Sequence, residues 1–134
     1  MKKEFKENID RLLGINLEIG SLFQSDSPDS NTNEEGFAGF EAKVEKLLAE
    51  KDIVIEKIKG LKAQSAEEFA ELRNSEYVEI WQQVQELEAK NMTAMKTVRS
   101  LLSKGAVDSK IQAKAIFSYK FNKEVKPRLF DDSL

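Results

Sequence analysis

The chain contains no cysteine and no histidine. These absences exclude disulfide bonds, thiol nucleophiles, zinc sites built from cysteine and histidine, Ser-His-Asp hydrolysis, histidine phosphotransfer and the Glu-x-x-His di-iron sites of helical bundles. No apolar run approaches the roughly 18 residues of a membrane-spanning helix, and the segment from Met1 to Asn8 lacks the apolar stretch of a secretory signal. We therefore expect a cytoplasmic protein without membrane insertion.

Signals for enzyme chemistry and for metal binding are also missing. The sequence has no glycine-rich phosphate loop, and its glutamates fall mostly at positions expected on solvated helix faces. The nearest approach to a metal motif is Asp29-x-Asn31-x-Asn33, which has the spacing that opens an EF-hand. That motif needs glycine at its sixth position and glutamate at its twelfth, where this chain has Glu34 and Phe40. We predict no enzyme activity, no cofactor and no metal site.

Proline and glycine are scarce, with 2 and 6 copies among 134 residues, while 40% of the residues are apolar and 34% are charged. This composition is typical of a helical protein, and we assign residues 1–134 to a single domain. The net charge of −3 is unevenly distributed along the chain: residues 1–89 carry 11 basic and 20 acidic side chains, whereas residues 90–128 carry 10 basic and 2 acidic ones. We interpret this distribution as electrostatic pairing between basic and acidic helices within the domain. Since no nucleic-acid-binding signature accompanies the basic residues, nucleic acid is not an expected partner.

Apolar residues recur at steps of three and four in three long segments, which is the pattern of amphipathic helices. The first predicted helix covers about residues 3–23, the second about 35–63, and the strongest part of the third about 76–104. The second and third are long enough to pair along their length. We therefore predict an all-α fold, an antiparallel three- to four-helix bundle with a long central helical hairpin and a mobile C-terminal tail.

Polar and helix-breaking residues mark the ends of these helices. The stretch from Ser25 to Asn33 has no apolar side chain and is rich in turn-forming residues, so we predict a loop over about 25–34. Ser65 and Glu68 have the spacing of a capping box that starts the third helix, which the segment 73–76 can interrupt. Gly105 suits the C-terminal end of that helix, and a short fourth helix can follow it.

The predicted core is carried mainly by the second and third helices. Its members are Val44, Leu47, Ile55, Ile58, Ile80, Val84, Leu87 and Val98. Two polar residues disturb the apolar stripes, since Lys51 interrupts that of the second helix and Asn91 stands in the seam of the third. We interpret Asn91 either as a device that fixes helix register or as a solvated edge of the seam.

Candidate partner-binding residues fall into two groups. In the third helix, Trp81, Met92 and Met95 can line a groove, because tryptophan offers a large anchoring area and methionine adapts to irregular partners. Ordinary core packing explains the same spacing and stays an alternative. The candidates in the C-terminal segment are Phe117, Tyr119, Phe121, Leu129 and Phe130. They suggest that residues 117–134 form a mobile tail that binds a partner or regulates binding, unless its first aromatic residues complete the core.

Four features follow one another along the chain. An N-terminal helix precedes a second helix that contains FEAKVEKLLAEKD at residues 40–52. A long third helix with Ile80-Trp81 and Lys90-Asn91-Met92 then leads to a tail ending in Leu129-Phe130-Asp131. This arrangement resembles the small flagellar type III export chaperones of the FliT/FlgN class. The late Phe-Asp pair is more similar to the tails of FliT proteins.

The resemblance implies a cytoplasmic helical bundle without enzyme activity that binds the C-terminal segment of a secreted flagellar subunit and prevents its premature assembly. The implied partner is a filament-cap protein for a FliT-like chain or a hook-associated protein for an FlgN-like chain. Amphipathic helices with few loops agree with this function, because they offer grooves for a partner helix. A structural coiled-coil adaptor or homodimeric scaffold without an export role fits the same sequence pattern and stays an alternative.

Overall fold

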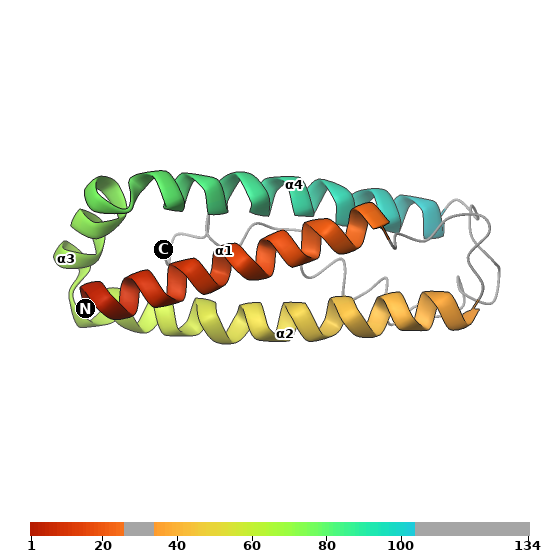
Figure 1. The fold of residues 1–134 in the computed structure, drawn as a ribbon, viewed down its shortest axis with the longest axis horizontal. Coiled ribbons are helices and arrows are strands. Elements are labelled where there is room, and N and C mark those ends of the chain that lie inside the picture. The colour runs from red at the N-terminus through yellow and green to blue at the C-terminus, as the bar shows by residue number, and fades with distance from the viewer. Residues whose placement is uncertain (26–33, 104–134) are drawn as a thin grey trace.

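The structure, a computed structural model, describes residues 1–25 and 34–103. Within them, α1 spans Lys2–Ser25, α2 Glu34–Gln64, α3 Ala66–Glu71, η1 Leu72–Glu76 and α4 Val78–Ser103 (Figure 1). These elements are all helical and the described residues include no strand, which confirms the predicted all-α bundle. The predicted tail at 117–134 and the helix end at Gly105 lie outside the described residues, as does most of the predicted loop.

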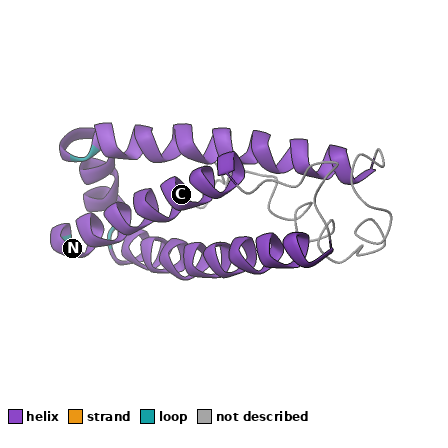
Figure 2. Cartoon of the chain, turned by 45° about the vertical axis from the view of Figure 1, so that its right-hand side comes forward, coloured by secondary structure: helices purple, strands orange, loops and turns teal. Residues whose placement is uncertain are grey.

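Of the three long helices, α1 packs against both of the others. Helices α2 and α4 run antiparallel, as a hairpin requires, and α1 crosses obliquely between them (Figures 1 and 2). The close backbone approaches of the long helices are those of α1 with α2 and of α1 with α4. The second and third predicted helices, which are long enough to pair along their length, form this hairpin, and α1 packs along each of them. A broad buried stripe on α1 makes this possible: Phe5, Ile9, Leu12, Ile15, Asn16, Ile19, Leu22 and Phe23.

Among the described residues, α1 supplies seven buried apolar side chains, α2 eight and α4 four, so α1 contributes to the core nearly as much as α2 does. Of the eight predicted core residues, five are buried: Val44, Ile55, Ile58, Val84 and Val98. Leu47 and Ile80 are partly buried and pack against the core. Leu87 is also partly buried but is not one of the residues that pack against the core. On α4, the predicted seam positions Val84, Asn91 and Val98 are buried, but the buried positions between them are Trp81, Glu88 and Met95, each one residue later than Ile80, Leu87 and Ala94. Neighbouring residues of a helix lie about 100° apart, so the face of α4 that is buried is turned toward Trp81, Glu88 and Met95 while the other three positions keep their place.

Two local features form the turn between α2 and α4. The Ser65 hydroxyl accepts a hydrogen bond from the Glu68 amide at 3.2 Å, which confirms the predicted cap of α3. The Ser65 amide donates to the Leu61 carbonyl at 3.3 Å, so it needs no return bond from the Glu68 carboxylate. The interruption predicted at 73–76 is the π-helical turn η1, closed by the Tyr77 amide on the Leu72 carbonyl at 2.9 Å.

A cluster of aromatic rings ties the start of α1 to this turn. Phe5 lies edge-on to Phe69 with ring centroids 5.4 Å apart, and it stacks on Tyr77 at the same distance. Trp81 completes the cluster, with its ring 6.2 Å from Phe5 and 5.9 Å from Phe69. The Arg73 guanidinium lies 5.9 Å from the Trp81 ring centroid, within the range of a cation–π contact. The cluster anchors one end of α1 against the α2–α4 hairpin.

Candidate functional site

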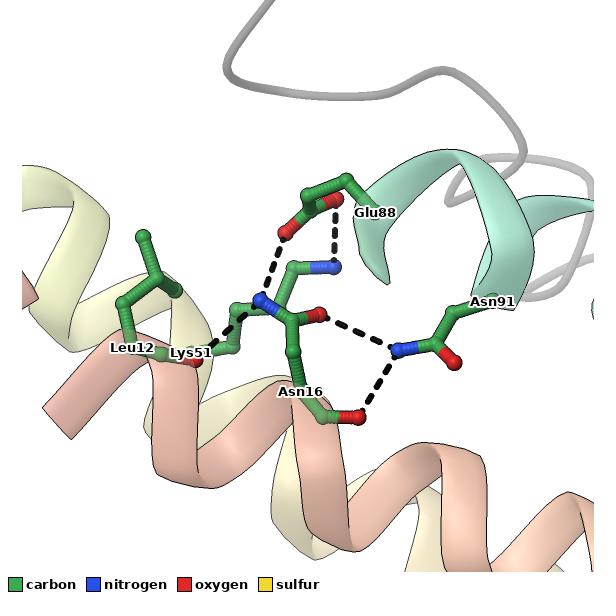
Figure 3. A network of polar contacts seen from close by, with 5 residues as sticks. All are labelled: Leu12, Asn16, Lys51, Glu88 and Asn91. Atoms are coloured by element: carbon green, nitrogen blue, oxygen red, sulfur yellow. Dashed lines mark hydrogen bonds and ion pairs between the residues drawn. The ribbon is translucent and has the colours of Figure 1, made fainter. Parts of the chain in front are cut away.

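Four polar side chains meet in the middle of the bundle, and we call them the polar core cluster: Asn16, Lys51, Glu88 and Asn91 (Figure 3). None is more than 3% exposed. They come from all three long helices, since Asn16 lies on α1, Lys51 on α2, and Glu88 and Asn91 on α4. A buried polar group is costly without hydrogen-bond partners, so the cluster has to be satisfied internally.

The Glu88 carboxylate is the centre of the polar core cluster. Its Oε2 accepts a hydrogen bond from Lys51 Nζ at 3.0 Å, and its Oε1 accepts one from Asn16 Nδ2 at 3.2 Å. One carboxylate of α4 is therefore bound by α2 and by α1 at once. Because the helix backbones of α2 and α4 do not approach closely, the Lys51–Glu88 ion pair is a direct link between these two helices.

The two asparagines join α1 to α4. Asn91 Nδ2 donates to both the Asn16 carbonyl oxygen, at 3.0 Å, and Asn16 Oδ1, at 3.1 Å. Asn16 Nδ2 also donates to the Leu12 carbonyl of its own helix at 3.1 Å. Asn91 is 2% exposed, which contradicts the alternative that it is a solvated edge of the seam.

An open apolar groove lies between α1 and α4 and has a volume of about 450 Å³. We call it the α1–α4 groove; it is lined by Leu13, Leu17, Gln83, Glu86, Leu87 and Lys90. Its α1 side is formed by two leucines, and its α4 side combines Leu87 with three polar or charged residues. Protein-binding surfaces commonly combine apolar and polar groups in this way. Leu17, in the lining of this groove, is 54% exposed.

A second groove, of about 370 Å³, lies between α1 and α2. It is lined by Glu18, Ser21, Leu22, Ser25, Lys43, Lys46, Leu47 and Glu50. Only two of these eight residues are apolar, and one of the two, Leu22, already belongs to the core. The two grooves expose equal apolar area, but in the α1–α4 groove a larger share of the lining residues is apolar, three leucines among six.

The residues predicted to bind a partner have different positions in the structure. Trp81 and Met95 are 5% and 1% exposed and pack in the core, while Met92 is partly buried. A direct contact of Trp81 or Met95 with a partner requires the helices to separate, and their binding role stays a prediction. The remaining candidates, Phe117, Tyr119, Phe121, Leu129 and Phe130, lie outside the described residues.

The sequence pattern did not predict the α1–α4 groove or the whole of the polar core cluster. The sequence pattern marks Lys51 and Asn91 as polar interruptions of apolar stripes, but it places Glu88 with the glutamates that are expected on solvated helix faces. A signal for Glu88 was a second seam on α4, since Trp81, Val84 and Glu88 also follow steps of three and four. Leu17 gave a signal for the groove, because it is apolar yet lies outside the buried stripe of α1.

Other kinds of site find no support in the described part of the chain. Among residues 1–25 and 34–103, no group of three acidic, histidine or cysteine side chains gathers to hold a metal ion. None of the helices in these ranges has the length and apolar character needed to cross a membrane.

At the surface, a hydrogen bond from Lys2 to Glu76, 2.7 Å long, raises the pKa of the Lys2 ammonium above its ordinary value of 10.5.

Comparison of the chain with protein-family models, with curated proteins and with solved structures finds no match.

Proposed function

We propose that this protein is a flagellar export chaperone of the FliT/FlgN kind. It binds the C-terminal segment of a secreted flagellar subunit, a filament-cap or hook-associated protein, in the cytoplasm and prevents premature assembly of that subunit. The resemblance of the sequence supplies the class of partner. The single observation that supports a binding role is the α1–α4 groove, with its exposed Leu17.

The geometry of the groove suits an amphipathic helix. Leu13 and Leu17 are four residues apart on α1 and stand on one face of that helix, opposite Leu87 of α4. A partner helix placed between α1 and α4 buries its own apolar face on these three leucines, which is the common helix-in-groove mode of recognition. Glu86 and Lys90 at the side of the groove then meet polar residues of the partner.

Leu17 and Ile53 provide a matched pair of variants for testing this proposal. Their side chains are almost equally exposed, at 54% and 55%, but Ile53 lies on α2 and does not line the groove. Burying the exposed half of a leucine contributes about 1 kcal/mol, and a lysine in its place must also be desolvated. We therefore expect Leu17→Lys to raise the Kd for the partner by at least about tenfold. Ile53→Lys should leave the Kd within about twofold of the parent value.

The measurement is titration calorimetry of the full chain with purified C-terminal segments of filament-cap and hook-associated proteins. Circular dichroism of both variants controls for folding. Equal affinities of the two variants would place the binding site elsewhere on the chain. If no flagellar subunit binds and light scattering gives a stable dimer, the protein is an adaptor or homodimeric scaffold instead.

A further inference from the structure

The α1–α4 groove lies directly outside the polar core cluster. Four residues of the groove are each next in sequence to a residue of the hydrogen-bonded network in Figure 3. Those groove residues are Leu13, Leu17, Leu87 and Lys90. Their neighbours in the network are Leu12, Asn16, Glu88 and Asn91. The same turns of α1 and α4 thus carry the groove on their outer side and the hydrogen bonds on their inner side.

Three hydrogen bonds cross from one wall of the groove to the other. Asn91 donates to the carbonyl and to the side-chain oxygen of Asn16, and Asn16 donates to Glu88. Hydrogen bonds weaken steeply when their length or angle changes, whereas apolar contacts are not directional. A slide of α4 along α1 by one turn, about 5.4 Å, loses all three bonds while many apolar contacts can be remade. The polar side chains are therefore the groups that select one register of these two helices.

Gly20 adds a second constraint on the approach of α4 to α1. A Cβ atom at this position would lie 3.3 Å from Asn91 Oδ1, a tighter contact than side chains normally make. The hydrogen atom of glycine leaves room for the Asn91 amide beside the α1 backbone. The close approach at Gly20 and the bonds at Asn16 hold the same α4 side chain from two successive turns of α1.

We propose that Asn16 and Asn91 are positioning residues of the α1–α4 groove. Their hydrogen bonds fix the spacing and the axial register of its two walls, so that the leucines of α1 and α4 face each other before a partner arrives. This deepens the proposed function and rests on it for the identity of the partner. A groove with fixed walls loses less conformational entropy on binding and discriminates between partner helices by the spacing of their apolar residues.

A positioning role and a merely stabilising role make opposite predictions. Replacement of a complete buried polar network by apolar residues of similar size is often neutral or stabilising. If the network positions the walls, an apolar version stays folded and loses its unique register. If the network only stabilises the bundle, an apolar version keeps the register, and only its unfolding midpoint changes.

The experiment measures the distance between the two walls in the full chain. Because the chain has no cysteine, spin labels can be attached at Asp10→Cys on α1 and Thr93→Cys on α4, both exposed positions, and the distance distribution recorded by pulsed electron resonance. The test variant replaces the whole cluster: Asn16→Leu, Lys51→Met, Glu88→Met and Asn91→Leu. The control, Ile9→Leu with Met95→Leu, changes buried apolar residues at nearly constant volume and leaves the hydrogen bonds intact.

We expect one narrow distance peak for the parent chain and for the control. In the test variant, the peak should broaden at least about twofold or gain a second maximum displaced by about one helical turn, near 5 Å. Its unfolding midpoint should equal or exceed that of the parent. A single narrow peak in the folded test variant would overturn the proposal.

If the fourfold variant shows no cooperative unfolding, Asn91→Leu alone is measured, and the same criterion decides. The distance measurement needs no partner. A negative result here therefore leaves the proposed function standing, and a failure to bind flagellar subunits leaves the positioning role standing.

Discussion

The glycines of α1 allow a prediction whose sign is set by the tertiary structure. Glycine in a helix interior is less stable than alanine by up to about 1 kcal/mol, so Gly→Ala stabilises a helix wherever the new methyl group has room. A Cβ atom at Gly14 meets nothing within 4 Å, whereas one at Gly20 comes to 3.3 Å from Asn91 Oδ1. We therefore expect the two substitutions to differ although they lie six residues apart on the same helix.

For Gly14→Ala the full gain of about 0.5–1 kcal/mol is expected in the free energy of unfolding. For Gly20→Ala, Asn91 must move away from α1, which weakens its hydrogen bonds to Asn16. Each such bond contributes about 0.5–1.5 kcal/mol, so the loss cancels or exceeds the gain. The expected result is a stabilised Gly14→Ala variant and a Gly20→Ala variant that is neutral or destabilised.

Urea unfolding followed by circular dichroism measures both values, with Gly60→Ala as a control. Gly60 lies in α2, and a Cβ atom there would also meet nothing within 4 Å, so it should behave as Gly14 does. In thermal unfolding, a gain of 1 kcal/mol corresponds to a rise of about 3–4 °C in the unfolding temperature of a domain of 134 residues. Equal stabilisation by Gly14→Ala and Gly20→Ala would refute the reasoning, because it would mean that Asn91 shifts at no cost.

Three further predictions concern the core, the surface and the C-terminal segment. Ile55→Ala should lower the free energy of unfolding by about 2–5 kcal/mol, because Ile55 is fully buried. Ile53, two residues earlier, is 55% exposed, so Ile53→Ala should change the free energy of unfolding by less than about 0.5 kcal/mol. Urea unfolding measures both variants, and similar values would contradict the assignment of the buried face of α2. Since the pKa of Lys2 is raised by Glu76, the stabilisation from this pair is fully present below the unfolded-state pKa of about 10.5 and is lost as the pH rises through the folded-state pKa. Lys2→Met should therefore remove this part of the decrease in unfolding temperature at alkaline pH. If the variant and the parent show the same decrease, the contact is absent. Deletion of residues 117–134 should tighten partner binding and preserve a cooperative thermal transition, and loss of that transition would mean that the segment completes the core.

The sequence by itself determined the helices and the places where they end. The steps of three and four in the apolar pattern, the Ser65 cap and the break at 73–76 all act within a few residues of themselves. Backbone hydrogen bonds and caps have this short range, so each segment contains the information for its own helix. The all-α bundle and most of the predicted core residues follow from the same local pattern.

Only the tertiary structure decided which face of α4 turns inward and where α1 lies. Glu88 is stable inside the bundle because Lys51, 37 residues away, and Asn16, 72 residues away, supply its hydrogen-bond donors. No local rule connects such distant positions, and a glutamate considered alone belongs in water. With Glu88 inside, the partly buried Leu87 lies beside Leu17 in the lining of the α1–α4 groove. The groove thus results from long-range pairing of polar groups, which the order of residues along one helix does not reveal.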